Sequence, residues 1–314
     1  MNFAICLSKF YISRCDALIK SINKFKKHNI YLLCFDNETY NYYKPKKKVK
    51  LLSLESLLKF DTHLKKIIAT RKFIDQIITS RPVFIKFLNK EYNIKEIYLL
   101  DSDIFFFSEP ENLMKFTSSS SVAFSEHDFN LKKKTLNKTY GKYNAGFVYI
   151  KFDRNGKQFL KEWISLCKEW CEFNLKKNKF SDQKYLENLK IKIKNVKILS
   201  HPGINLAPWN LENKKVTINN NKITVNGEKL IFFHFHGLRK ILNFFYILGT
   251  SNYNFYLKNS LKNILFKPYI NIISNYKQKD YFWSKNKKKN LFMKIPFLFK
   301  KFMLNDFYFK FLKN

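Results

Sequence analysis

Arginine is scarce in this chain, and acidic residues are few. Of its 59 basic residues only five are arginines, and 24 acidic residues leave a formal net charge of +35. A charge of this size usually indicates nucleic acid or an anionic membrane as partner. Recognition of base edges and bidentate recognition of phosphate favour arginine, so we expect no nucleic acid as partner. A proteome-wide bias towards lysine would give the same charge. The charge is still compatible with a phosphorylated substrate or a lipid surface as partner.

Long hydrophobic runs are missing as well. No stretch has the roughly 18 to 20 uncharged apolar residues that a membrane span needs. Residues 1–9 lack both the basic start and the apolar length of a signal peptide. We therefore expect a cytoplasmic protein, either free or peripheral at the inner face of the membrane.

Cysteine is infrequent and forms no metal-binding pattern. The five cysteines are odd in number and contain no C-x-x-C pair, which argues against a disulfide framework and against a zinc ribbon. Cys167 and Cys171 lie one helical turn apart, where they would supply half of a metal site or simply pack in the core.

What the chain does contain is typical of a folded α/β domain. Hydrophobic residues make up 46% and aromatic residues 18% of its 314 residues, enough to bury one large core with an appendage. Residues 3–7 and 30–35 are short apolar runs, and apolar residues between 15 and 25 recur at helical spacing. Strand, helix and strand in this order predict a parallel α/β sheet whose strand ends face a nucleotide.

Further elements follow along the chain. We predict strands at residues 49–54, 122–124, 143–150, 196–199 and 230–235, and helices at 64–78, from 81 onward, at 159–170 and at 181–189. Pro82 is expected in the first turn of its helix, and Ser181 is expected to be an N-cap. The Asn226-Gly227 pair predicts a type I′ hairpin turn. Residues 128–143 are expected to form a loop or lid, and the residues after 241 show no clear strand.

An apolar run over residues 96–107 is interrupted by Asp101 and Asp103. So short a run predicts a buried strand, where charged side chains almost never lie without a partner. Two acids at the carboxyl end of a parallel strand are well placed to hold a hard cation, which would bridge a diphosphate. The alternative is a strand that ends in an Asp-Ser-Asp turn, where the Asp side chains bond nearby backbone.

Four short motifs favour the first interpretation. They are Tyr98 to Asp103, Tyr143 to Gly146, Ser181 to Gln183 and His234 to Gly237. Their order and spacing resemble those of nucleotide-sugar glycosyltransferases with the GT-A fold, particularly the family 8 type and related nucleotide-diphospho-sugar transferases. The resemblance covers residues 1–245 and implies an α/β fold, a Rossmann-like mixed sheet with helices on both faces. Residues 246–314 would be a basic, aromatic, mainly helical C-terminal extension associated with the acceptor or a membrane.

The resemblance implies a metal site. Asp101 and Asp103 match the D-x-D acids that bind a divalent cation, usually Mn2+, with Mg2+ as the other candidate. His234 and Gly237 fit the H-x-x-G motif whose histidine completes this site. His236 faces the same side of a strand and is the alternative ligand. The diphosphate of the donor would bind to the same cation.

The resemblance also assigns residues to the donor. Asn144, Asp182 and Gln183 match positions that hold the transferred sugar and flank its anomeric carbon, although they would also serve as turn and cap residues. The other residues expected to bind the donor are Ser8, Asp36, Arg81, Ser102, Gly237 and Lys240. The Pro-Trp pair that usually follows the phosphate-binding lysine is missing after Lys240, and Arg239 is a substitute for that lysine.

Several assignments stay open at this point. Either Glu126 or Asp128 would contact sugar or acceptor, and Trp209 would stack on a sugar or fill the core. The segment Phe292–Phe311 interleaves apolar residues with lysine, so it would lie on an anionic bilayer or pack back on the main domain.

Together these expectations define a reaction. The chain would transfer a hexose from a nucleotide-diphosphate sugar, with UDP as the expected nucleotide, to a glycan or lipid-linked acceptor in polysaccharide or lipopolysaccharide synthesis. The cation and Lys240 would stabilise the charge that develops on the leaving nucleoside diphosphate. The family retains the anomeric configuration, and no residue stands out as a nucleophile, which favours departure and attack on the same face. The alternative is a basic membrane- or nucleic-acid-binding module without catalysis.

Overall fold

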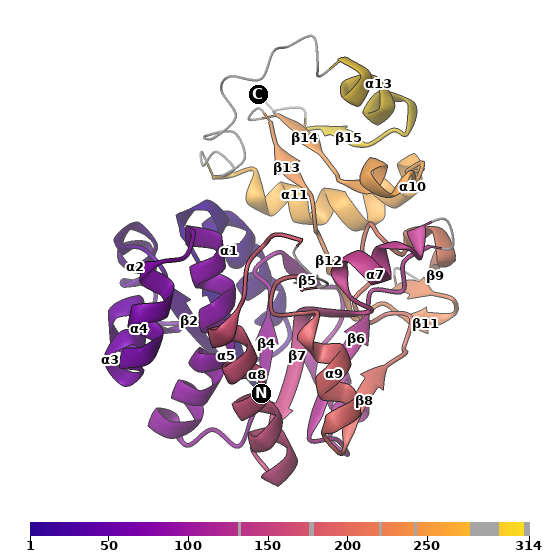
Figure 1. Cartoon of the computed structure of the whole chain (residues 1–314). Helices are drawn as coiled ribbons and strands as arrows, with labels where there is room; N and C mark the ends of the chain where they lie inside the picture. The colour runs from indigo at the N-terminus through magenta and orange to yellow at the C-terminus, as the bar shows by residue number, and fades with distance from the viewer. Residues whose placement is uncertain (131–132, 176–178, 220–221, 242–243, 277–294, 311–314) are drawn as a thin grey trace. The chain divides into compact units, whose positions relative to one another are not determined.

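The computed structural model (Figure 1) describes residues 1–130, 133–175, 179–219, 222–241, 244–276 and 295–310. The chain forms two compact units. The first consists of Met1–Lys9, Phe25–Ser102 and Glu109–Ser200, and the second of Phe10–Lys24, Asp103–Ser108 and His201–Asn314. The D-x-D motif is thereby divided, because Asp101 belongs to the first unit and Asp103 to the second. The functional boundary expected after residue 245 stays a prediction.

A seven-stranded mixed sheet forms the centre of the first unit. Its strands are, in order across the sheet, β3 (Lys50–Ser53), β2 (Asn29–Cys34), β1 (Asn2–Leu7), β4 (Glu96–Leu100), β7 (Tyr143–Lys151), β6 (Val122–Glu126) and β8 (Val196–Leu199). Strand β7 runs antiparallel to β4 and β6, whereas the other neighbouring pairs are parallel. The other strands predicted for this unit are confirmed to within two residues at each end, since each is a short apolar run with a clear boundary, but the strand predicted over 96–107 ends at Leu100 as β4.

Helices cover both faces of this sheet (Figure 1). They are α2 (Asn37–Tyr43), α3 (Leu54–Phe60), α4 (Thr62–Ala69), α5 (Phe73–Tyr92), α6 (Met114–Thr117), α7 (Leu136–Tyr140), α8 (Arg154–Glu169) and α9 (Tyr185–Lys192). Leu99 of β4 lies in one core with Phe84 of α5 and Trp163 of α8. Its neighbour Tyr98 points to the opposite face, where its hydroxyl lies 2.8 Å from Thr117 Oγ1 of α6. Alternate residues of one strand therefore anchor helices on opposite faces.

The helix that carries Arg81 begins earlier than the sequence predicts. Helix α4 ends at Ala69 and α5 begins at Phe73, so the helix predicted at residues 64–78 is interrupted. Pro82 lies inside α5, not in a first turn, and Arg81 is in the middle of the helix. An interior proline removes a backbone hydrogen bond. Burial of the apolar side chains that follow outweighs this cost; these are Val83, Phe84, Ile85 and Leu88, each 0% exposed.

Ser181 is not an N-cap, contrary to the prediction. Helix α9 begins only at Tyr185, and Ser181 has a positive φ of 54°. The turn before α9 is fixed by tertiary contacts that no local pattern reveals. The indole Nε1 of Trp163 donates to the backbone oxygen of Asp182 at 2.9 Å, and the Asp182 carboxylate pairs with Arg81. Asp182 and Gln183 therefore lie in this turn and not in the helix.

The described part of the second unit contains three small sheets. Strand β5 (Ile104–Phe106) pairs antiparallel with β12 (Phe232–His234), so the predicted run 96–107 is split between β4 and β5. Strands β9 (Val216–Asn219), β10 (Lys222–Val225) and β11 (Glu228–Lys229) form a meander. The third sheet consists of β13 (Arg239–Lys240), β14 (Phe245–Ile247) and β15 (Phe307–Phe309). The predicted type I′ turn is confirmed, because Asn226 and Gly227 have φ values of 51° and 86°.

Helices and aromatic side chains complete the second unit. Its helices are α1 (Ile12–Ile22), α10 (Asn259–Leu261), α11 (Lys267–Ile273) and α13 (Ile295–Met303). The rings of Phe235 and Tyr269 stack at 3.9 Å between centroids in its core. The prediction of no strand after residue 241 is wrong. Strands β14 and β15 pair although about sixty residues lie between them, and such long-range pairing has no local signature.

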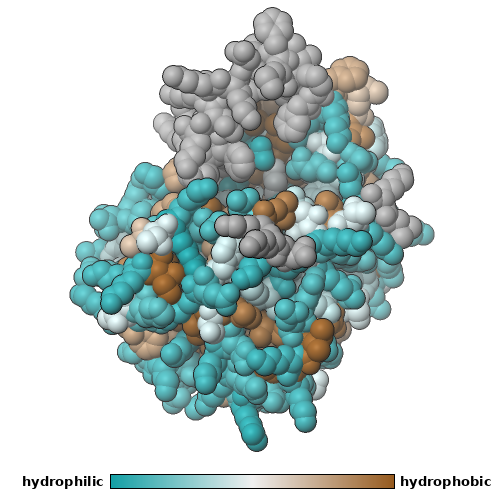
Figure 2. All heavy atoms as spheres, in the orientation of Figure 1, coloured by the Kyte–Doolittle hydropathy of each residue, from teal (hydrophilic) through white to brown (hydrophobic). Residues whose placement is uncertain are grey.

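The visible surface is mostly hydrophilic, with small apolar areas scattered over it (Figure 2). This agrees with the lysine-rich composition of the chain. Within the described residues, no helix combines the length and the apolar character that crossing a bilayer requires. The predicted amphipathic segment Phe292–Phe311 falls partly outside the described residues, which resume at residue 295 and end at 310.

Candidate active site

The carboxyl end of β4 presents Asp101 to a buried arginine. The backbone N–H of Asp101 donates to Gly146 O of β7 at 2.8 Å, which continues the β4–β7 pairing by one residue. Oδ1 of Asp101 lies 3.0 Å from Nη2 of Arg81. The strand register thus fixes the backbone of the first D-x-D acid, and an arginine from α5 is one partner of its carboxylate.

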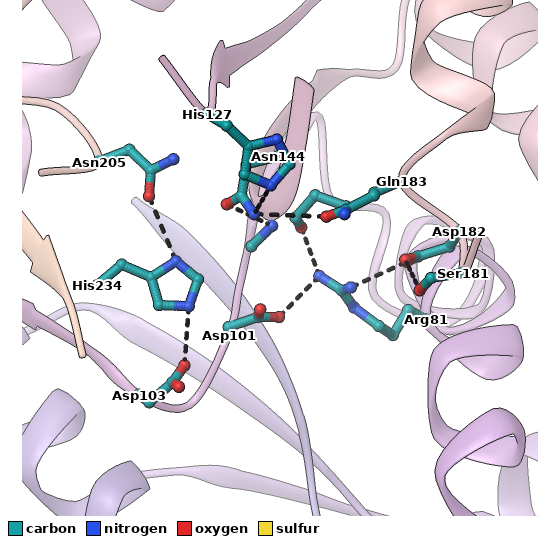
Figure 3. Close-up of polar contacts among 12 residues, drawn as sticks. Arg81, Asp101, Asp103, His127, Asn144, Ser181, Asp182, Gln183, Asn205 and His234 are labelled. Carbon is teal, nitrogen blue, oxygen red and sulfur yellow. Dashed lines mark hydrogen bonds and ion pairs between the residues drawn. The ribbon is translucent and has the colours of Figure 1, made fainter. Parts of the chain in front are cut away.

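Arg81 links three oxygen atoms of the first unit. Its Nη1 lies 2.9 Å from Oδ2 of Asp182, and its Nη2 also donates to Ala145 O at 2.6 Å (Figure 3). Burial disfavours the charged guanidinium, yet Asp182 and Asp101 outweigh burial and raise the pKa of Arg81. Burial raises the pKa of the Asp182 carboxyl, and the charge of Arg81 opposes that shift. Arg81 therefore joins the ends of β4 and β7 to the turn before α9.

Two amides lie beside this ion pair. Nδ2 of Asn144, at the start of β7, lies 3.5 Å from Oε1 of Gln183 in the turn before α9. Nδ2 of Asn144 also lies 3.2 Å from Nε2 of His127, a buried residue that the sequence analysis did not select. His127 stands between Glu126 and Asp128, the two residues between which the sequence could not choose. A single histidine without a spacing motif carries no local signal that would have identified it.

The second D-x-D acid has a different partner in the second unit. Oδ1 of Asp103 lies 3.1 Å from Nε2 of His234, at the end of β12 (Figure 3). The backbone places them together, because Phe235 N–H donates to Asp103 O at 2.8 Å. Burial would raise the pKa of Asp103, but His234, His236 and Arg14 outweigh burial and hold that pKa well below its usual range.

Among the described residues, Asp103, His234 and His236 form a group whose possible ligand atoms all lie within 4.8 Å of one another. A carboxylate oxygen and two imidazole nitrogens at this separation are a donor set that suits a divalent first-row metal ion. Both histidines that the sequence offered as alternatives belong to the group, whereas Asp101 does not. The residues present therefore fit the cation that the resemblance implies.

The surroundings of His234 restrict its orientation. Its Nδ1 lies 3.3 Å from Oδ1 of Asn205, a fully buried residue with a positive φ of 58°. The indole of Trp209 meets the rings of His234 and His236 edge to face, at centroid distances of 5.0 and 5.5 Å. Trp209 is 2% exposed, which favours the prediction that it fills the core over the prediction that it stacks on a sugar.

The remaining predicted donor residues have structural contacts of their own. Asp36 caps α2, because its Oδ1 accepts from the N–H of Thr39 at 2.7 Å. Nζ of Lys240 donates to Tyr276 O at 2.5 Å. Ser8 and Ser102 are buried, and Gly237 has a positive φ of 80°. Within the first unit the structure brings together Arg81, Asp101, Asn144, Asp182 and Gln183, and within the second Asp103, His234 and His236.

Comparison with known proteins identifies the chain. A family model described as nucleotide-diphospho-sugar transferase matches residues 26–200, which is more than half of the sequence. The chain belongs to this family. The transferase is 30% identical over 251 residues to the uncharacterized protein YfnF of Bacillus subtilis (strain 168), covering 76% of this chain and 82% of YfnF. It is 26% identical over 242 residues to YfnD of the same strain, covering 75% of this chain and 77% of YfnD.

A solved structure agrees with the fold. The transferase matches the galactosyltransferase LgtC, crystallised with donor and acceptor sugar analogues, at a TM-score of 0.50 and 10% identity, over 90% of this chain and 99% of LgtC. The predicted GT-A fold, with its mixed sheet, is confirmed. The transferase is a glycosyltransferase that uses a nucleotide-sugar donor. The alternative of a basic module without catalysis is therefore set aside.

Proposed function

We propose that the transferase moves a hexose from a UDP-linked donor to a glycan or lipid-linked acceptor, with a divalent cation held by Asp103, His234 and His236. The observation that carries this proposal is the group formed by these three side chains, with ligand atoms within 4.8 Å of one another. When bound, the cation would offset negative charge on the departing nucleoside diphosphate. Asp103 and His234 belong to the motifs for which the sequence expected this role.

The chemistry of the donor set favours Mn2+ over Mg2+. Imidazole nitrogen suits transition metals, and Mg2+ prefers oxygen ligands in near-octahedral geometry. Two of the three proposed ligands are imidazoles. Binding of the same cation by Asp101 stays a prediction. The ion pair with Arg81 uses Oδ1 of Asp101, and a carboxylate has a second oxygen, so this ion pair is compatible with metal binding.

The residues of the first unit would act on the sugar. Asn144 and Gln183 would hold the sugar by amide hydrogen bonds, and Asp182 would lie near the anomeric carbon. Arg81 would keep Asp101 and Asp182 in place, in addition to any contact with the donor. Ser8, Asp36, Ser102, Gly237 and Lys240 are proposed to bind the nucleotide part of the donor. We propose transfer with retention of configuration, by departure and attack on the same face.

A test of the proposal measures release of the nucleoside diphosphate. Purified protein with Mn2+ is expected to release UDP from a UDP-hexose, and Asp103→Ala is expected to abolish the release. Glu55→Gln removes an exposed acid of α3 and serves as the matched control, which should keep the activity of the wild type. A screen of UDP- and GDP-sugars identifies the donor, and the anomeric configuration of the product tests retention. Metal-independent turnover by Asp103→Ala would contradict the proposal.

We also propose that the C-terminal part contacts an anionic membrane, where a lipid-linked acceptor of a surface polysaccharide would lie. Three apolar side chains on one side of α13 are strongly exposed: Phe299 at 63%, Phe302 at 67% and Met303 at 59%. Lys300 beside them is also exposed. Exposed apolar and basic side chains at helical spacing are typical of interfacial helices.

Vesicle sedimentation tests this contact. The protein is expected to sediment with anionic vesicles and not with neutral ones, and Phe302→Ser with Phe299→Ser should weaken sedimentation. Ile191→Ser removes an even more exposed apolar side chain, from α9, and is the control. Equal sedimentation of the double variant and the control would show that α13 makes no such contact.

A further inference from the structure

Hydrogen bonds link His127 to the amides of Asn144 and Gln183 in the candidate active site (Figure 3), and two further bonds to the adjacent residues Tyr140 and Gly141 complete a ring. Nδ1 of His127 lies 2.9 Å from Gly141 O, and Nε2 lies 3.2 Å from Nδ2 of Asn144. Nδ2 of Asn144 also donates to Oε1 of Gln183 at 3.5 Å. Nε2 of Gln183 donates to Tyr140 O at 2.9 Å, which closes the ring at the end of α7. All five residues belong to the first unit.

The partners determine where each proton lies. A backbone oxygen only accepts, so Nδ1 of His127 must carry the hydrogen that reaches Gly141 O. Oδ1 of Asn144 accepts from the N–H of Gly146 at 3.1 Å, which turns Nδ2 towards His127. Nε2 of His127 must therefore accept, and the imidazole is the neutral tautomer with its proton on Nδ1. A doubly protonated ring would set two donors against each other.

The hydrogen bonds of Gln183 determine the orientation of its amide in the same way. Its Nε2 donates to Tyr140 O, so its Oε1 is the atom that faces Asn144. The segment that the sequence predicted as a loop or lid thus supplies both fixed acceptors of the ring, at Tyr140 and Gly141. The donor-to-acceptor direction is consistent around the whole ring.

His127 is itself held in place on three sides. Its ring stacks on Phe129 at 4.6 Å between centroids and an interplanar angle of 11°. Its backbone N–H donates to Lys142 O at 2.9 Å, next to the strand β7 that carries Asn144. The side chain is 4% exposed, and Asn144 is 6% exposed. A buried ring fixed by stacking, backbone and side-chain contacts can hold an amide in one orientation.

We propose that His127 is a positioning residue for sugar transfer: its neutral imidazole fixes the amide of Asn144 and, through Asn144, that of Gln183. This inference rests on the proposed function, which places both amides beside the transferred sugar. His127 need not touch the donor. Loss of its Nε2 acceptor would remove one of the contacts that hold the Asn144 amide, so the amide could tilt away from its position at the sugar although Oδ1 still accepts from Gly146 N–H. Small errors in the placement of reacting groups reduce the rate of the chemical step more than the affinity for the nucleotide.

Three substitutions separate this role from simple packing. In His127→Gln the side-chain amide reaches the position of Nε2, so its oxygen can accept from Asn144. In His127→Asn the shorter amide reaches only the position of Nδ1 and can donate to Gly141 O. His127→Phe keeps the ring that stacks on Phe129 and removes both nitrogens. The measured quantities are kcat and the donor KM for UDP release with Mn2+, together with the melting temperature of each variant.

The expected result is a division between the variants. His127→Gln should keep kcat within about threefold of the wild type. His127→Asn and His127→Phe should lose about 10- to 100-fold in kcat with little change in the donor KM. A packing role would instead lower the melting temperature and would not separate Gln from Asn. Equal kcat in all three folded variants would overturn the inference.

The proposed function and this inference fail in different ways. If the wild type releases no nucleoside diphosphate from any donor in the screen, the proposed function fails before the variants are compared. If the wild type is active and His127→Asn matches His127→Gln, only the positioning role is excluded. Should His127→Phe not fold, the comparison of Gln with Asn alone still decides the question, because both replacements are amides.

Discussion

Nη1 of Arg81 lies 2.9 Å from Oδ2 of Asp182, and the two side chains are 7% and 2% exposed. Nη2 of the same guanidinium lies 3.0 Å from Oδ1 of Asp101. One buried cation therefore stabilises two carboxylates that belong to different motifs of the sequence. A planar guanidinium with several N–H donors can bridge two acids, whereas an ammonium is a compact point charge.

Arg81→Lys is expected to destabilise the protein by about 2–4 kcal/mol, because one buried carboxylate loses its cationic partner. Urea unfolding measures this loss. Arg154→Lys, at an exposed position in the first turn of α8, is the matched control and should stay within about 0.5 kcal/mol of the wild type. A small and equal effect of both substitutions would show that the double contact of Arg81 contributes little.

Mn2+ affinity is expected to depend on Asp103 and His236. Asp103→Asn and His236→Gln should each weaken Mn2+ binding by at least about tenfold, since even outer partners of metal ligands change affinity by that factor. Titration followed by electron paramagnetic resonance measures binding directly, without turnover. His63→Gln alters an exposed histidine of α4 and controls for non-specific binding. Unchanged affinity in His236→Gln would leave His234 as the histidine ligand.

Asn205 is expected to orient His234 for metal binding. Asn205→Gly removes the Oδ1 that lies 3.3 Å from His234 Nδ1, while glycine adopts the positive φ of this position without strain. The substitution should weaken Mn2+ binding by about 10- to 100-fold. Asn205→Asp keeps an acceptor oxygen at the same position and should bind Mn2+ more tightly than the glycine variant. The opposite order would contradict the orienting role.

Donor and metal are expected to stabilise the protein together. A ligand present at about 100 times its dissociation constant adds about 2.7 kcal/mol to the free energy of unfolding. UDP with Mn2+ should raise the melting temperature, and UDP with a chelator should raise it less. The Asp103→Ala variant should lose the part of the shift that requires the metal. If UDP raised the melting temperature equally with Mn2+ and with a chelator, this would argue against nucleotide binding through the cation.

The buried ion pair of Asp306 with Lys301 is expected to stabilise the pairing of β14 with β15. Asp306 is 0% exposed and accepts from Thr250 N–H at 2.8 Å, from Ser251 Oγ at 2.6 Å and from Lys301 Nζ at 2.9 Å. Asp306→Ala leaves Lys301 buried without this partner, which costs about 3–5 kcal/mol. Hydrogen exchange should show lost protection in β14 and β15. Retained protection there would mean that apolar packing alone holds these strands.

Short apolar runs, turn residues and motif order could be recognised from the sequence, because each depends on neighbouring residues. Strands β1, β2, β4 and β7, the turn at Asn226 and the family resemblance were all accessible in this way. The same local reasoning failed at Pro82 and Ser181. There, burial of α5 and the contacts of Asp182 with distant residues outweighed the local preference.

The sequence by itself determined which side chains were available for chemistry at the ends of the strands. Only the tertiary structure decided their partners: Asp101 with Arg81, Asp103 with His234, and Asn144 with His127. The physical reason is that an ion pair or hydrogen bond needs atoms about 3 Å apart, and residues far apart in the chain reach this distance only when the sheets and helices pack.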